Sequence, residues 1–254
     1  MSSIAVETAA TAPPESAPWR RALRRLVKRR GAMVGAFVVL FFVVVAVCAP
    51  LISPYDPIAT NWSLVRKPPS AAHWFGTDEI GRDVLARIIY GARASLLAGV
   101  VSVCISLVCG VPIGLVAGYV GGLLDGLLMR ITDAMLACPF LILAIALAAF
   151  LGPSLSNAMI AIGISAMPAF IRLTRAQVLN AKVEDYVEAA RAVGNPHLRI
   201  VLRHILPNIV APIMVQATLA IALAIIAEAS LSFLGLGQQP PAPSWGSIDR
   251  KSVV

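Results

Sequence analysis

Five long apolar stretches constrain this chain more than any other feature of its sequence. Only 13% of its residues are charged, about half of the ~25% usual in soluble domains. Each stretch is close to the ~20 residues that an α-helix needs to cross a bilayer. We therefore expect an all-α membrane protein with five visible transmembrane helices. The expected spans are residues 32–52, 94–119, 127–151, 157–173 and 209–234.

The cations are distributed unequally between the loops that join these spans. If residue 1 lies in the cytoplasm, that side of the membrane holds 14 Lys and Arg residues and the other side holds 7. Because cytoplasmic loops carry the excess of cations, we expect a multi-pass protein with a cytoplasmic N-terminus. The formal net charge of +8 does not indicate nucleic-acid binding, since the arginines flank apolar spans rather than lining a soluble face.

The residues before the first span divide into two parts. Residues 1–18, rich in Ala, Ser, Thr and Pro, predict a disordered tail. Residues 19–31 carry seven cations with apolar residues at helical spacing between them. They predict a basic amphipathic helix on the cytoplasmic face of the lipid, with a plain topogenic charge cluster as the alternative.

The polar segment 184–207 has strong helix signals. Acidic residues at 184, 185 and 188 favour a helix N-terminus. Gly194 is a natural C-cap and Pro196 cannot continue a helix. A second, basic helical stretch is expected over residues 197–205. Together they predict a short helical knuckle between two spans, on the cytoplasmic side.

This segment also has a recognisable spacing. Glu-Ala-Ala is followed by three residues, Gly, nine residues, one position usually held by Ile, one residue, and Leu-Pro. It resembles the coupling loop of ABC-importer permease subunits. His204 replaces the usual Ile, and the run His-Ile-Leu-Pro-Asn at 204–208 is similar to the dipeptide, oligopeptide and nickel branch. The candidate coupling residues are Tyr186, Glu188, Ala189, Ala190, Gly194, His204, Leu206 and Pro207.

The stretch 76–93 supports the same family. Its Gly-Thr-Asp-x-x-Gly-Arg-Asp and Tyr-Gly-Ala-Arg resemble the C-type permease subunit of peptide importers. Independently of that resemblance, Thr77 or Asp78 can cap a helix, and the apolar residues that follow share one face. We expect an interfacial helix on the outer side, as a structural elbow rather than a substrate site.

The resemblance implies a permease subunit of an ATP-driven importer of di- or oligopeptides in the bacterial inner membrane, with nickel, glutathione or haem as alternative cargoes. It implies pairing with a different permease subunit, two ATPase subunits and an extracytoplasmic binding protein. ATP and Mg would bind to the ATPases, so we expect no enzyme activity and no cofactor here. An ATP-independent channel or secondary carrier is the alternative.

The family fold that the resemblance implies has six membrane helices. Residues 247–254 are too few and too polar for a sixth span, since crossing a bilayer takes ~20 apolar residues. We expect a permease domain over residues 32–246 and a short C-terminal tail after it.

Three further groups of residues are candidates for specific roles. Gly110, Gly114 and Gly118 recur at every fourth position, which predicts close packing of membrane helices. Asp133 and Glu228 are carboxylates within spans, and such groups are candidates for a transport path or a structural polar contact. Asp133 lies three residues after Arg130 on one helix face, so the two side chains could pair. No Cys and His spacing indicates a metal site.

Overall fold

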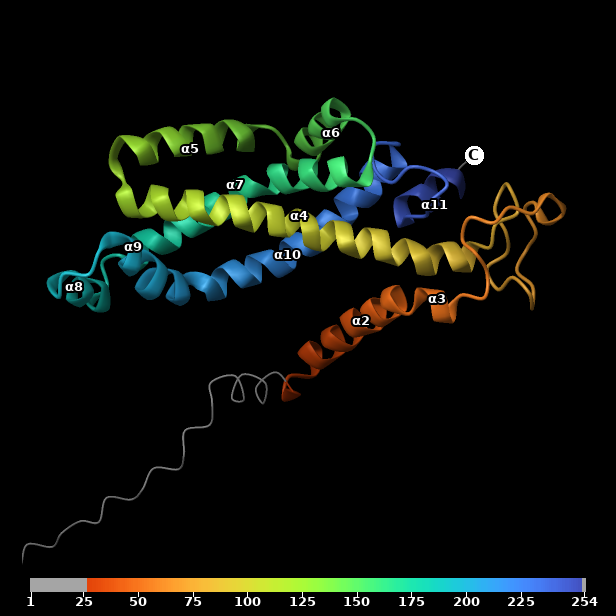
Figure 1. Cartoon of the computed structure of the whole chain (residues 1–254), viewed down its shortest axis with the longest axis horizontal. Coiled ribbons are helices and arrows are strands. Elements are labelled where there is room, and N and C mark those ends of the chain that lie inside the picture. Colours follow the sequence, from red (N-terminus) through yellow and green to blue (C-terminus); the bar gives the residue numbers. More distant parts are fainter. Residues whose placement is uncertain (1–26, 253–254) are drawn as a thin grey trace, which may run out of the picture. The chain divides into compact units, whose positions relative to one another are not determined.

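The computed structural model describes residues 27–252, which form helices joined by loops (Figure 1). The predicted tail 1–18 and most of the predicted basic helix 19–31 lie outside the described residues. The chain divides into two compact units, residues 1–44 and 45–254, and each is described by itself.

The described part of the first unit is dominated by helix α2 (Arg30–Val47), which continues a few residues beyond it. Its mean hydropathy is 2.4, and its apolar side chains are exposed on all sides, Phe37 to 69%. A helix that is apolar all round belongs in a membrane or a large core. This helix agrees with the first predicted span, which ends in the short helix α3 (Ala49–Ile52).

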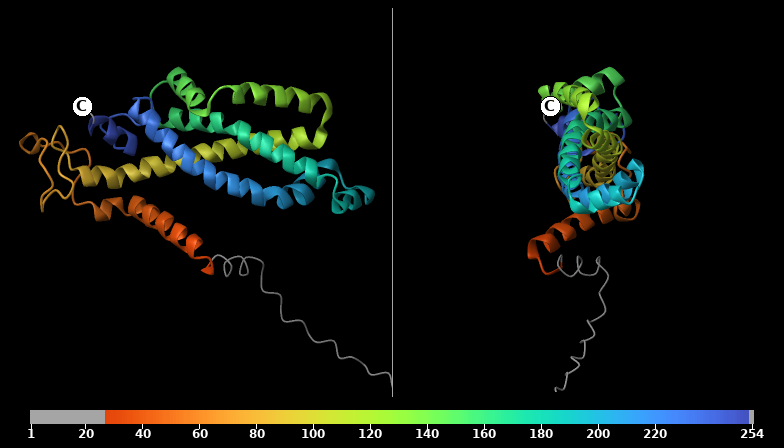
Figure 2. Two further views of the ribbon diagram at one scale, coloured as in Figure 1. Left: turned by 180° about the vertical axis from the view of Figure 1, so that it is seen from behind. Right: turned by 90° about the vertical axis from the view of Figure 1, so that its left-hand side faces the viewer.

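Three long helices form the core of the second unit. Helices α4 (Val84–Val120), α7 (Leu155–Ala181) and α10 (Leu206–Phe233) run side by side (Figure 2). The glycine strip of α4 faces α7. A Cβ atom added at Gly114 would lie 2.6 Å from the carbonyl oxygen of Ile171, and one at Gly118 would lie 2.9 Å from that of Arg175. The absence of side chains here lets the two backbones approach.

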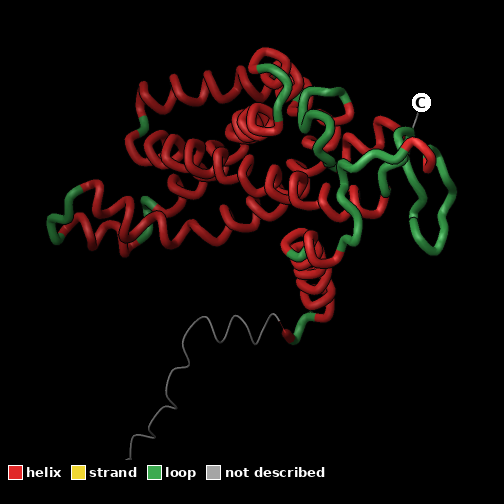
Figure 3. The backbone as a smooth tube through the Cα atoms, turned by 45° about the vertical axis from the view of Figure 1, so that its right-hand side comes forward, coloured by secondary structure: helices red, strands yellow, loops and turns green. Residues whose placement is uncertain are grey.

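The third predicted span is not one continuous helix. It forms α5 (Gly122–Ala137) and α6 (Phe140–Leu151), bent by 92° (Figure 3). The bend lies at Pro139, which has no N–H to donate, and Cys138 before it is extended with ψ 128°, as a residue preceding proline prefers. Counting this pair once, the described residues contain up to five helices able to span a membrane.

The prediction of a separate interfacial helix in the stretch 76–93 was wrong. Residues 78–83 form a turn, and the Asp83 carboxylate accepts a hydrogen bond from the Ala86 N–H (2.7 Å). This N-cap starts α4 at Val84, and the helix continues without interruption into the second span. The apolar residues assigned to an interfacial face are therefore the first turns of a membrane helix.

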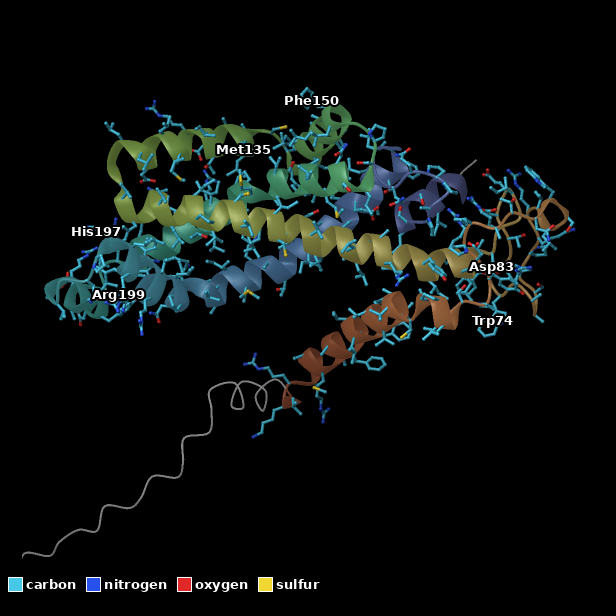
Figure 4. All side chains as sticks on the ribbon, viewed as in Figure 1. Trp74, Asp83, Met135, Phe150, His197 and Arg199 are labelled. Carbon is cyan, nitrogen blue, oxygen red and sulfur yellow. The ribbon has the colours of Figure 1, made fainter. Side chains whose placement is uncertain are left out.

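The second unit has two different ends (Figure 1). At one end, which we call the α11 end, lie the loop 53–83, with the 3₁₀ turn Trp62–Leu64, and helix α11 (Trp245–Ser252). At the other, the α8 end, lie α8 (Asp185–Ala192), α9 (His197–Arg199) and a π-helical stretch (Ile200–Ile205) that leads into α10. Figure 4 shows Trp74 and Asp83 at the first end and His197 and Arg199 at the second.

Candidate functional site

Helix α8 begins and ends where the sequence chemistry requires. Asp185 and Glu188 lie in its first turn, where negative charge favours the helix dipole. At its end Gly194 has φ +81°, its N–H donates to the Arg191 carbonyl (2.9 Å), and the Asn195 N–H donates to the Ala190 carbonyl (3.2 Å). These two bonds form a Schellman motif, so the turn after α8 has a defined geometry.

An eight-residue helix is marginal by itself, and packing on one face holds α8 in place. Val187 is fully buried and Ala190 is 7% exposed. Tyr186, Glu188 and Ala189 are exposed on the other side. The helix thus has one face fixed to the protein and one face free.

Polar contacts attach this segment to the end of α4. The Tyr119 hydroxyl and His197 Nδ1 are 2.7 Å apart, and the Arg191 guanidinium lies 5.9 Å from the centre of the Tyr119 ring. The Lys182 ammonium donates to the Gly118 carbonyl (3.1 Å). A displacement of α8 would therefore be transmitted to the end of α4 through these contacts. Sequence reasoning missed Tyr119 and His197, because they are 78 positions apart in the chain.

The π-helical stretch has a local cause in Pro207. This residue lies at the start of α10 and lacks an N–H, and its ring crowds the carbonyl four residues earlier. The helical turn widens to a π-helix immediately before it, as at many functional sites. His204 is half-buried within this widened turn, and its carbonyl accepts from the Asn208 amide (2.6 Å). Leu206 is also half-buried.

The free side of the α8 end carries apolar side chains. Val193 is 82% exposed, Leu198 70% and Leu202 51%. With Tyr186 and Glu188, these three residues form what we call the coupling surface. Exposed apolar side chains at a polar segment are candidates for contact with a partner protein. The sequence search identified Tyr186 and Glu188 but missed Leu198 and Leu202, which recur at a helical spacing of four.

The two candidate carboxylates lie away from the coupling surface. Glu228 is fully buried in α10, where it accepts hydrogen bonds from the hydroxyls of Ser95 (2.8 Å) and Ser232 (2.6 Å). Asp133 contacts Arg172 of α7 (2.8 Å). Its predicted pairing with Arg130 was wrong, because α5 turns Asp133 toward the neighbouring helix.

Within residues 27–252, no group of three or more His, Cys, Asp and Glu side chains is arranged to hold a metal ion. An anchored helix, a fixed turn and an exposed apolar patch can bind a protein groove and move as one body.

Comparison with known proteins gives consistent results. Residues 110–251 match the family model of the binding-protein-dependent transport system inner membrane component, and residues 17–69 match the N-terminal TM domain of oligopeptide transport permease C. The dipeptide transport system permease protein DppC of Alkalihalophilus pseudofirmus is 48% identical over 93% of this chain and 79% of its own length.

Other similar proteins are named for the transport of different cargoes. The di/tripeptide permease DppC of Pseudomonas aeruginosa is 45% identical over 91% of this chain and 78% of its own. The glutathione permease GsiD of Escherichia coli is 45% identical over 91% and 77%. Among solved structures, an inward-facing MetNI methionine ABC transporter has a TM-score of 0.53 at 20% identity, covering 66% of this chain and 88% of that one. This last likeness concerns the fold alone.

Proposed function

The chain belongs to the family of binding-protein-dependent inner-membrane transport components and is a permease subunit of an ABC importer, and we propose that its cargo is di- or oligopeptides. Two relatives named as dipeptide or di/tripeptide permeases, at 48% and 45% identity, support this cargo. Glutathione is a second candidate, because a 45% identical relative is named as its permease. Glutathione is itself a tripeptide, so both cargoes share charged termini and amide bonds.

The coupling surface is the observation on which the mechanism rests. We place the α8 end in the cytoplasm, with the N-terminus, because 14 of the 21 cations fall on that side and cytoplasmic loops carry such an excess. An ATPase subunit would receive Tyr186, Val193 and Leu198 in a groove. ATP and Mg would bind to that partner, and this chain would carry out no covalent chemistry.

Movement would pass from the ATPase into the membrane through the contacts of Tyr119 and Lys182. These contacts join the knuckle to α4, and α4 is packed against α7 along its glycine strip. A rigid connection of this kind suits alternating access, in which a second permease subunit forms the other half of the pathway. An extracytoplasmic binding protein would deliver cargo at the α11 end.

The test replaces apolar side chains of the coupling surface by charge. We expect the double variant Val193→Asp, Leu198→Asp to insert normally but to lose copurification with the ATPase subunits and to lose peptide uptake, because a carboxylate buried in a groove without a partner is costly. The matched control is Ile58→Asp, an exposed apolar residue (45%) at the α11 end. Normal copurification and uptake in the double variant would contradict the docking role.

A further inference from the structure

Two arginine–aspartate pairs join α5 to α7, and they differ in geometry. Arg175 binds Asp125 through two contacts, of 2.5 and 2.6 Å, and their side chains are 31% and 15% exposed. Arg172 binds Asp133 through a single contact of 2.8 Å, with side chains 57% and 54% exposed. In a bidentate pair the guanidinium and the carboxylate hydrogen-bond to each other through two atoms each, so the Arg175–Asp125 pair has little capacity left for a ligand. The second pair keeps one carboxylate oxygen and much of the guanidinium available.

The open pair lies within two helices of the bundle rather than in a loop. Arg172 is nine residues before the end of α7 at Ala181, which corresponds to about 14 Å at 1.5 Å per residue. Asp133 lies well inside α5, one half of the broken span. Charged side chains within membrane helices almost always face a water-filled cavity or another protein rather than lipid, and they mark substrate paths. The exposed side of this pair is therefore open to water or to a partner subunit, as a group on a translocation path would be.

A cavity opens at the same place. It has a volume of about 300 Å³ and is lined by Met129, Asp133, Arg172 and Arg175. One wall is cationic and one is anionic, so the cavity suits a ligand with both charges. Met129 adds a flexible thioether that adapts to different apolar shapes.

We propose that Arg172 and Asp133 bind the charged termini of the peptide cargo as it crosses the membrane. Guanidinium is the preferred partner of a planar carboxylate, so Arg172 takes the C-terminal carboxylate. The Asp133 carboxylate accepts hydrogen bonds from the α-ammonium group. Every unmodified peptide has these two groups, whatever its side chains, and this suits a path for cargo of varied sequence. The inference rests on the proposed peptide cargo.

Cargo protection of a cysteine placed in the cavity tests this assignment. The Met129→Cys variant, on a background without the four native cysteines, is assembled with the second permease, the ATPases and the binding protein in lipid nanodiscs without ATP. We expect saturating alanyl-phenylalanine to slow its reaction with a water-soluble maleimide about tenfold, because a ligand site buries roughly 70–90% of its ligand and bound cargo would fill the space that the reagent must enter. The same dipeptide with an acetylated N-terminus and an amidated C-terminus should give no protection.

Two further variants separate the pair from general electrostatics. Adding Arg172→Gln should abolish protection by the free dipeptide. Adding Arg130→Gln should leave it unchanged, because Arg130 is an exposed cation next to Met129 on the same helix and takes no part in either ion pair. Equal protection by the capped dipeptide, or protection that survives Arg172→Gln, would overturn the assignment. A cysteine at position 129 that stays unreactive would also overturn it, by showing that a partner subunit covers the pair.

ATP-driven uptake of alanyl-phenylalanine separates this inference from the proposed function, and it is measured with the same subunits reconstituted into sealed proteoliposomes, without the Arg172→Gln substitution. Uptake without protection refutes the role of Arg172 and Asp133 and leaves the peptide importer standing. Absence of uptake, in an assembly whose ATPase responds to its binding protein, refutes the peptide cargo itself.

Discussion

The two ends of the second unit use charged residues in opposite ways. At the α11 end Arg82 is 2% exposed, Arg87 is 3% exposed and Glu228 is fully buried. At the α8 end the charged residues Glu184, Asp185, Glu188 and Arg191 are exposed, together with apolar side chains. These three buried groups of the α11 end are held by contacts within the chain, whereas the charged side chains of α8 are open to solvent.

The contacts of the α11 end show how it is closed. The Arg82 Nε donates to Asp78 (2.7 Å), and the Arg87 guanidinium donates to the carbonyls of Pro57 (3.1 Å) and Pro241 (3.4 Å). Arg87 thus ties the loop before α4 to the loop after α10. A buried cation is costly unless it is paired and hydrogen-bonded, so these contacts hold both loops in position.

The largest expected difference between the two ends is in thermal stability after replacement of a glutamate, Glu228 at the α11 end or Glu188 at the α8 end. Glu228→Ala removes the acceptor of two buried hydroxyls, Ser95 and Ser232. Each orphaned buried group costs about 1–3 kcal/mol, so we expect a strong loss of thermal stability in detergent. Glu188→Ala should lower the unfolding temperature only slightly, because its side chain is exposed and its contribution is limited to the helix dipole. Similar melting temperatures for the two variants would contradict a closed α11 end.

Replacement of glycines is also expected to have different effects at the α11 end and the α8 end. A Cβ atom at Gly246 would lie 2.0 Å from the Ala229 carbonyl oxygen, whereas nothing lies within 4 Å of one at Gly194. Gly246→Ala should therefore displace α11 from α10, measured as faster proteolysis after residue 234.

Replacement of Gly194, at the α8 end, should destabilise the protein for a different reason. Gly194→Val should weaken only the local turn, by about 1–2 kcal/mol, because a branched residue disfavours the left-handed conformation. We expect this variant to insert normally and to uncouple ATP hydrolysis from uptake, measured on the purified importer. Normal coupling in Gly194→Val would mean that the shape of the turn after α8 is unimportant for docking.

The smallest expected effect concerns pH at the α11 end. Burial opposes ionisation of Asp78, but hydrogen bonds from the Arg82 side chain and from the Arg82 and Ile80 N–H groups outweigh it and lower the pKa of Asp78 below its usual 3.8. A lowered pKa stabilises the folded state above pH 3.8, and that contribution is lost as the pH falls through the folded-state value.

Between pH 8 and pH 5 the α11 end should therefore show no change from this group. Asp78→Asn should lower the unfolding temperature slightly at neutral pH and should remove the loss of stability below pH 3.8. The measurement is thermal unfolding across the pH range, with Asp56→Asn as the control, since Asp56 is an exposed acid of the same loop. An equal effect of the two substitutions would contradict the role of the Arg82 contacts.

The membrane class, the presence of long apolar helices and the helical segment 184–205 could be predicted from the sequence alone, whereas the break in the third span and the start of α4 at Val84 could not. Apolar length identifies a membrane helix without knowledge of its neighbours, because lipid satisfies no backbone hydrogen bond and the helix must satisfy its own. The turn at Gly194 was equally readable, since glycine and the following proline act on the backbone locally. These features depend on residues that are close together in the chain.

Only the tertiary structure decided which charged groups meet. Asp133 binds Arg172, 39 positions away, and Glu228 binds Ser95, 133 positions away. Tyr119 reaches His197 in the same way. Spacing along one helix favoured Arg130 as the partner of Asp133, but helix packing brings the side chains of another helix closer. The periodicity of a sequence shows which face of a helix is polar. It does not show which side chain of another helix meets that face, because this depends on how the two helices pack.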